Sequence, residues 1–153
     1  MNAAAQAIVT RLQLEPLPHE GGFFRVTWRN ATASAIYFLI TPEHFSALHR
    51  LAQDEIWFFH AGDPVEHLRL DSRLGETQVT RLGPAADAGD RPQIVVPAGV
   101  WQGARPAGDH HGYSLLGCTV SPPWDAGGFE LGDRKWLQAA FPAARALIQT
   151  LTR

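Results

Sequence analysis

The sequence predicts an all-β sandwich or barrel flanked by short helices. Between Phe23 and Val120, short β-rich runs alternate with turn residues at near-regular spacing. The residues before and after this region instead place apolar side chains at helical spacing. The 153-residue chain has no low-complexity linker and is the size of one domain, so 1–153 is expected to fold as a single domain with a barrel core at about 23–120.

The elements follow in order along the chain. A short amphipathic helix is expected over about 2–14, and Pro16 and Pro18 end it. The tail, about 133–151, reads as two short helices, with Pro142 suited to the first turn of the second one. The predicted strands between these helices cover 23–29, 34–40, 45–51, 55–61, 65–71, 77–82, 93–96, 102–105 and 113–120.

Composition and charge exclude several classes of function. Apolar residues make up 45% and charged residues 18%, which is typical of a globular protein. The net charge is -2 and no basic block occurs, so nucleic-acid binding is not expected. No run suits a signal peptide or a membrane helix, and Cys118 is the single cysteine. These features predict a soluble protein of the cytoplasm without an internal disulfide.

Two neighbouring strands carry an imidazole and a carboxylate among apolar side chains. Because side chains alternate along a strand, an inward His49 would place Phe45 on the same face. An inward Glu55 would likewise bring Trp57 and Phe59 into the interior. Buried polar groups cost free energy unless they are paired or bind something, so this pattern indicates a pocket. The alternatives are a core histidine and a structural salt bridge of Glu55 with a nearby arginine, Arg25 or Arg50.

A third polar side chain follows a tight turn. Pro97, Ala98 and Gly99 precede a new strand, on which Gln102 is expected to face the same cavity. Its amide offers one acceptor and two donors to a ligand. Tyr37 is a further candidate ligand contact, although the residue pattern favours a barrel-wall tyrosine. Glu20 and Phe24 are candidates as well, because Gly21 and Gly22 allow a close approach of the backbone, and a purely structural turn at 20–22 is the equal alternative. His60 is expected to point outward, and His110 and His111 to lie in a solvated loop.

These segments resemble the two cupin motifs. The first motif falls on His49, Leu51, Glu55 and Gly62, and the second on Pro97, Gly99 and Gln102. The whole chain resembles the cupin subfamily named domain of unknown function 985, or cupin type 5. The segments that carry this resemblance are Pro18-His19-Glu20-Gly21-Gly22-Phe23-Phe24-Arg25, Ser34-Ala35-Ile36-Tyr37-Phe38-Leu39-Ile40, Asp54-Glu55-Ile56-Trp57, Ala61-Gly62-Asp63-Pro64, Val96-Pro97-Ala98-Gly99-Val100-Trp101-Gln102, Gly117-Cys118-Thr119-Val120 and Phe129-Glu130-Leu131-Gly132-Asp133-Arg134.

The resemblance implies a double-stranded β-helix, the jelly-roll barrel of cupins, often paired as a homodimer. Ile56, Phe58 and the run 94–96 offer apolar side chains for such an interface. A standard cupin metal site has three histidines and a glutamate, but Leu51 and Gln102 stand here in place of two of the histidines. One imidazole, one carboxylate and one amide bind transition metals weakly. We therefore expect no cofactor, with a divalent metal on His49, Glu55 and Gln102 as the alternative.

The sequence leaves more than one function open, including whether the chain is an enzyme at all. An isomerase, epimerase or lyase acting on a small polar or sugar-like metabolite would use His49 and Glu55 as its acid and base. A binding protein that holds a small ligand without chemistry would use the same pocket. A metal-dependent cupin with Gln102 as a substitute ligand is the third hypothesis.

Overall fold

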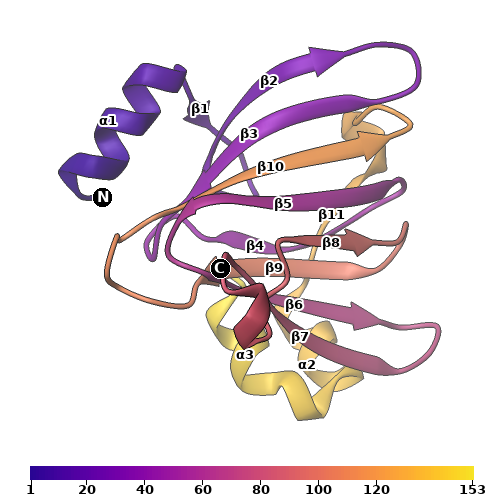
Figure 1. The fold of residues 1–153 in the computed structure, drawn as a ribbon. Helices are drawn as coiled ribbons and strands as arrows, with labels where there is room; N and C mark the ends of the chain where they lie inside the picture. The colour runs from indigo at the N-terminus through magenta and orange to yellow at the C-terminus, as the bar shows by residue number, and fades with distance from the viewer.

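The computed structural model describes residues 1–153. Two antiparallel sheets face each other (Figure 1). One has six strands in the order β1-β2-β3-β10-β5-β8, and the other has five in the order β11-β4-β9-β6-β7. The six-stranded sheet comprises β1 (Glu15–Pro16), β2 (Phe23–Arg29), β3 (Ser34–Ile40), β10 (Ser114–Ser121), β5 (Asp54–Gly62) and β8 (Gln93–Val96). The five-stranded sheet comprises β11 (Phe129–Leu131), β4 (Ser46–Leu51), β9 (Trp101–Pro106), β6 (Val65–Asp71) and β7 (Glu76–Leu82).

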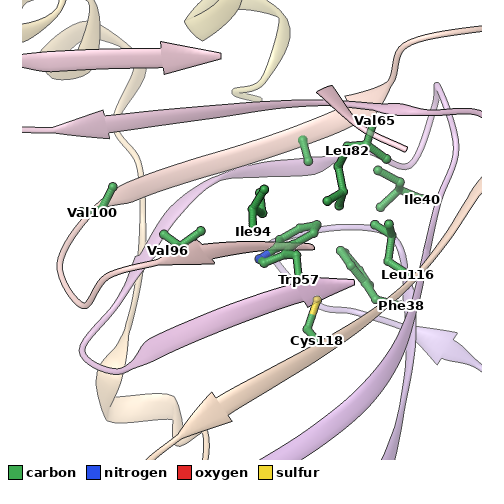
Figure 2. Packing of buried hydrophobic residues seen from close by; sticks show 11 residues of the cluster. Phe38, Ile40, Trp57, Val65, Leu82, Ile94, Val96, Val100, Leu116 and Cys118 are labelled. Carbon is green, nitrogen blue, oxygen red and sulfur yellow. The ribbon is translucent and has the colours of Figure 1, made fainter. Parts of the chain in front are cut away.

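Alternating side chains build the core between the two sheets. On β3, Phe38 and Ile40 are buried in this core, as Leu116 and Cys118 are on β10. Val65 of β6 and Leu82 of β7 meet them from the five-stranded sheet, as Figure 2 shows around Trp57. The arrangement confirms the all-β class, and its topology suits the expected jelly roll.

The helices cover only part of the outside. The five-stranded sheet packs its outer side chains, including Leu48 and Leu68, against α2 (Arg134–Ala140) and α3 (Arg145–Thr150). The first helix, α1 (Ala3–Leu12), packs near one end of the six-stranded sheet through Ala5. Asn2 caps it, because its side chain accepts a hydrogen bond from the backbone N–H of Ala5. Short 3₁₀ turns complete the chain at Ala86–Ala88, Ala126–Gly128 and Pro142–Ala144.

Most of the outer face of the six-stranded sheet carries no helix. Trp28, Tyr37 and Val95 are 51%, 38% and 49% exposed there, and Ile56 and Phe58 are half-buried beside them. The sequence places Ile56, Phe58 and Val95 outward correctly, but Ile94 and Val96 face the core. None of the helices is long and apolar enough to cross a membrane.

All nine predicted strands are present, with bounds that shift by one residue at most. The two flanking helical regions are also present, and the second tail helix begins with the 3₁₀ turn at Pro142–Ala144. The sequence does not predict two short strands, β1 and β11. The omission of β11 matters for function, because Phe129 and its neighbours pair with Leu51 and His49 of β4.

Candidate functional site

A cavity of about 430 Å³ opens between the two sheets at one end of the barrel. Twelve of its 19 lining residues are hydrophobic, so it has the mostly apolar wall of a small-molecule site. The apolar wall includes Phe24, Ile36, Phe38, Trp57, Val120 and Phe129. Two carboxyls and an imidazole, all strongly buried, interrupt this wall: Glu20, Glu55 and His49.

His49 enters the cavity from β4 with only 1% of its surface exposed. Its Nδ1 lies 2.8 Å from the carbonyl oxygen of Ala47, and a carbonyl can only accept, so Nδ1 carries the hydrogen. The ring stacks on Phe129, with centroids 5.4 Å apart and planes 22° from parallel. Burial lowers the pKa of His49, an effect that the nearby Glu55 partly offsets. The neutral ring therefore presents an unprotonated Nε2.

Glu20 approaches His49 from a tight loop. One carboxylate oxygen, Oε1, accepts a hydrogen bond from Ser46 Oγ at 2.7 Å, and Oε2 lies 3.7 Å from His49 Nε2. Burial raises the pKa of Glu20 from 4.5 to about 7, although Ser46 and the charge of Arg153 act in the opposite direction. At neutral pH this carboxyl is therefore available both as an acid and as a base.

The conformation of the loop accounts for the position of Glu20. His19 and Gly21 have φ angles of 66° and 100°, in the region that favours glycine. A Cβ on Gly21 would lie 2.5 Å from the carbonyl oxygen of Phe45 and would also collide with the guanidinium of Arg153. That guanidinium donates to the carbonyl oxygens of Glu20 and Phe45, at 2.7 and 3.1 Å. The loop is thus packed closely enough to need glycine.

Glu55 lies on β5, where it is 6% exposed. Its Oε2 accepts a hydrogen bond from Gln102 Nε2 at 2.6 Å. Burial is the main cause that raises its pKa from 4.5 to about 7; the charge of Glu20 adds to the increase, while His49 opposes it. The salt-bridge alternative is wrong, because Arg50 pairs with Glu130 at 2.6 Å and Arg25 contacts Gln13.

Gln102 does not line the cavity but supports it. The residue pairs with His49 across β9 and β4, and its amide reaches Glu55 inside the barrel. Its Oε1 is buried without a hydrogen-bond partner, as are Trp57 Nε1 and both ring nitrogens of His67. These atoms belong to a polar layer next to the cavity.

His67 is a member of this layer that the sequence does not mark as a site residue. It lies on β6 and is fully buried, with its ring edge-on to Trp57 at 4.8 Å between centroids. Burial, assisted by the charge of Arg69, lowers the pKa of His67 to about 3, so the ring is neutral. The available signal was strand alternation, since His67 lies two residues from the inward-facing Val65.

Besides Gln102, three of the predicted ligand contacts lie away from the cavity. Phe59 shares the inner face of β5 but packs against the filled core. Phe45 precedes the first residue of β4, so strand alternation does not extend to it, and it packs beside Arg153 and the tail helices. Tyr37 lies on the outer face, with its ring edge toward His60. Glu20, Phe24, His49, Glu55 and Trp57 do line the cavity.

The donor set does not fit the metal that the cupin fold usually implies. Leu51 brings an apolar side chain where the motif has an imidazole, and the Gln102 amide donates to Glu55. The structure contains no group of three or more His, Cys, Asp or Glu side chains arranged to hold a metal ion. The expectation of no cofactor, and its alternative of a divalent metal on His49, Glu55 and Gln102, are both for elemental analysis to test.

Comparison with known proteins identifies the architecture. The family model described as "Cupin superfamily (DUF985)" matches residues 6–132. A hypothetical protein from Leishmania major is 32% identical, with a TM-score of 0.88 over 97% of this chain and 98% of that one. Protein SO0799 from Shewanella oneidensis is 37% identical, with a TM-score of 0.87 over 100% of this chain and 98% of that one. No protein of curated function matches the chain.

More distant structures share the fold alone. Oxalate decarboxylase from Lactobacillus farciminis, in a formate complex, is 12% identical, with a TM-score of 0.59 over 94% of this chain and 43% of that one. A variant of PAC13 from Streptomyces, with uridine, is 14% identical, with a TM-score of 0.53 over 80% of this chain and 87% of that one. At these identities the likeness carries no statement about substrate or reaction.

Proposed function

The chain belongs to the Cupin superfamily (DUF985) family, and from this premise we propose that its barrel cavity is an acid–base active site. The reaction is an isomerisation, epimerisation or elimination on a small polar metabolite. One observation carries the proposal: a neutral imidazole with a free Nε2, His49, shares an apolar cavity with Glu20 and Glu55, whose pKa values both lie at about 7.

The cluster of His49, Glu20 and Glu55 suits proton transfer at neutral pH. General acids and bases work best when their pKa lies near the operating pH, and burial tunes carboxyls toward that range. In the proposed step, an ionised carboxylate or His49 Nε2 accepts a proton from a substrate carbon next to a carbonyl. A protonated carboxyl of the site gives its proton to the carbonyl oxygen, which yields the neutral enol. Return of a proton to the other face of the same carbon, while a carboxylate of the site takes back the enol hydroxyl proton, completes an epimerisation. For an isomerisation the proton goes to the former carbonyl carbon, and the carboxylate takes the proton of a hydroxyl on the neighbouring carbon, which becomes the new carbonyl.

The surroundings support a small substrate held away from bulk water. The volume of about 430 Å³ is in the range of metabolite and drug-sized ligand sites. Aromatic side chains from three different strands, Phe24, Phe38 and Trp57, border the ionisable group. Low polarity around the carboxyls strengthens their interactions with the reacting atoms.

The decisive experiment identifies a substrate and then removes the acid–base groups. Small molecules released from protein purified under mild conditions supply candidates for turnover assays by mass spectrometry. His49→Ala and Glu55→Gln are each expected to lower kcat by at least about a hundredfold. Glu15→Gln, which changes an exposed carboxylate of β1, is the matched control and should retain wild-type turnover. Wild-type rates in both active-site variants would remove the catalytic proposal.

A second candidate function is binding without chemistry. The observation that favours it is the missing cupin donor set, because the cavity is well formed while a resident metal has few ligands. Ligand-induced thermal stabilisation with no product after prolonged incubation would support this function. Product formation that depends on Glu55 would reject it.

A further inference from the structure

The charges inside the cavity are unbalanced. Glu20 and Glu55 are both at least nine-tenths buried, and neither forms an ion pair with a lysine or arginine side chain. The imidazole between them, His49, is kept neutral by its burial. Two carboxyls thus lie in an apolar cavity without a cationic side chain to pair with them.

From this imbalance we infer that the cavity binds an organic cation, an amine or substituted ammonium group on an apolar body, between Glu20 and Glu55. This inference deepens the proposed function and rests on the same site. Neutral ligands such as sugars would leave the cost of the two buried carboxyls in place, whereas a cation offsets it.

The neighbours of each carboxyl support this assignment. The Glu20 carboxyl faces Ser46 and His49 of β4. The Arg153 guanidinium lies on the backbone side of Glu20, where it donates to the carbonyl oxygens of Glu20 and Phe45. Glu55 faces His49, the Gln102 amide, the Trp57 indole and the Cys118 thiol, together with Glu20. Of these groups, only Arg153 carries a positive charge, and it does not line the cavity.

The walls of the cavity suit the same ligand. Aromatic faces attract ammonium groups through their π electrons, and this attraction is strongest when both partners are removed from water. Phe38, Trp57 and Phe129 line the chamber together with the two glutamates. The indole of Trp57 lies beside Glu55, so an ammonium group next to this carboxylate would also meet an aromatic ring.

An anionic ligand is disfavoured for the same reason. The one arginine that lines the cavity, Arg29, is exposed, and its guanidinium donates to the carbonyl oxygen of Trp124 at 2.7 Å. His19 also lies on an exposed part of the lining. A carboxylate or phosphate that entered past Arg29 would meet two acidic groups further in.

The test uses three probes with one body and different charges: 2-phenylethylammonium, 2-phenylethanol and 3-phenylpropanoate, with sorbitol as a neutral polyol. Binding to the full chain is measured by calorimetry at pH 7.5. We expect the ammonium to bind at least tenfold more tightly than the alcohol, and the carboxylate to bind more weakly than either. Glu20→Gln and Glu55→Gln should each reduce ammonium binding at least tenfold, and Glu15→Gln should leave it unchanged.

The pH dependence gives an independent readout. Below pH 7 the ammonium must displace protons from Glu20 and Glu55, so its affinity should rise by up to about tenfold per pH unit for each proton released. Above pH 7 the affinity should level off, because His49 is already neutral and a primary ammonium stays charged up to about pH 9. Calorimetry in buffers with different ionisation enthalpies counts the protons directly.

The outcomes separate this inference from the proposed function. Tighter binding of 2-phenylethanol, sorbitol or 3-phenylpropanoate than of the ammonium overturns the cation assignment while leaving an acid–base site intact. Ammonium binding that survives both glutamate variants, or that does not depend on pH, overturns it as well. Failure of the ammonium to bind at millimolar concentration has the same consequence. Loss of the proposed function is judged separately, from turnover in the His49→Ala and Glu55→Gln variants.

Discussion

The two ends of the barrel interior differ although the same strands build both. On β10, Cys118 and Val120 line the cavity, while Leu116 fills the closed end. On β3, Ile36 lines the cavity and Ile40 packs in the core. Figure 2 shows the closed end, where Ile40, Leu116, Val65 and Leu82 gather from both sheets. Stability and ligand binding thus depend on opposite ends of the same strands.

Truncating a side chain at the closed end should destabilise the protein more than any other change proposed below. Leu116→Ala removes a fully buried side chain from a packed cluster, so the free energy of unfolding should fall by about 3–5 kcal/mol. The matched variant is Leu51→Ala, which shortens a side chain that already borders the cavity. The unfolding free energy lost in Leu51→Ala should be smaller, because the Leu51 side chain has fewer packed neighbours that would lose their contacts. Denaturant unfolding measures both, and equal losses would break the distinction between the two ends.

The second effect is electrostatic and belongs to the cavity end. Because the pKa of Glu55 is raised in the folded protein, its contribution to stability is greatest below pH 4.5 and is lost as the pH rises to about 7. Glu55→Gln removes this dependence. The free energy of unfolding of the variant relative to wild type should therefore increase by about 3 kcal/mol between pH 4.5 and pH 8.

The control for this effect is Glu15→Gln, at an exposed carboxylate. Its difference from wild type should stay nearly constant over the same pH range. Unfolding in urea at each pH provides the comparison. A flat difference for Glu55→Gln would show that the buried carboxyl keeps its ordinary pKa.

A third variant, Gly21→Ala, tests whether close packing of the loop holds Glu20 in position. Gly21→Ala adds a Cβ against the Phe45 carbonyl and Arg153 at a φ of 100°, and should cost about 1–3 kcal/mol of unfolding free energy. Gly89→Ala is the matched control, because Gly89 has the same φ but open space around its Cβ position. The loss of unfolding free energy in Gly21→Ala beyond that in Gly89→Ala measures the close packing of the loop. Equal losses in the two variants would show that backbone strain alone accounts for the effect at Gly21.

The sequence predicts the β region well because alternation and turn residues are local signals. It identifies His49 and Glu55 because a motif marks them, and Glu20 because its loop resembles the family. It misses His67 and Phe129, whose positions depend on which strands pair across the barrel. It also misplaces Phe45 and Phe59, since a short β-rich run shows neither its first paired residue nor the end of the cavity. The expected homodimer stays a prediction.

The smallest effect on stability should accompany a large effect on binding. Val120→Phe places a larger side chain into existing space, so the free energy of unfolding should change by less than about 1 kcal/mol. The added ring occupies part of the roughly 430 Å³ volume next to Cys118, so affinity for 2-phenylethylammonium should fall at least tenfold. Calorimetry and denaturant unfolding on the same preparation measure both quantities. Unchanged affinity would mean that the probe binds outside the cavity, and the functional contrast between the two ends of the barrel would then be lost.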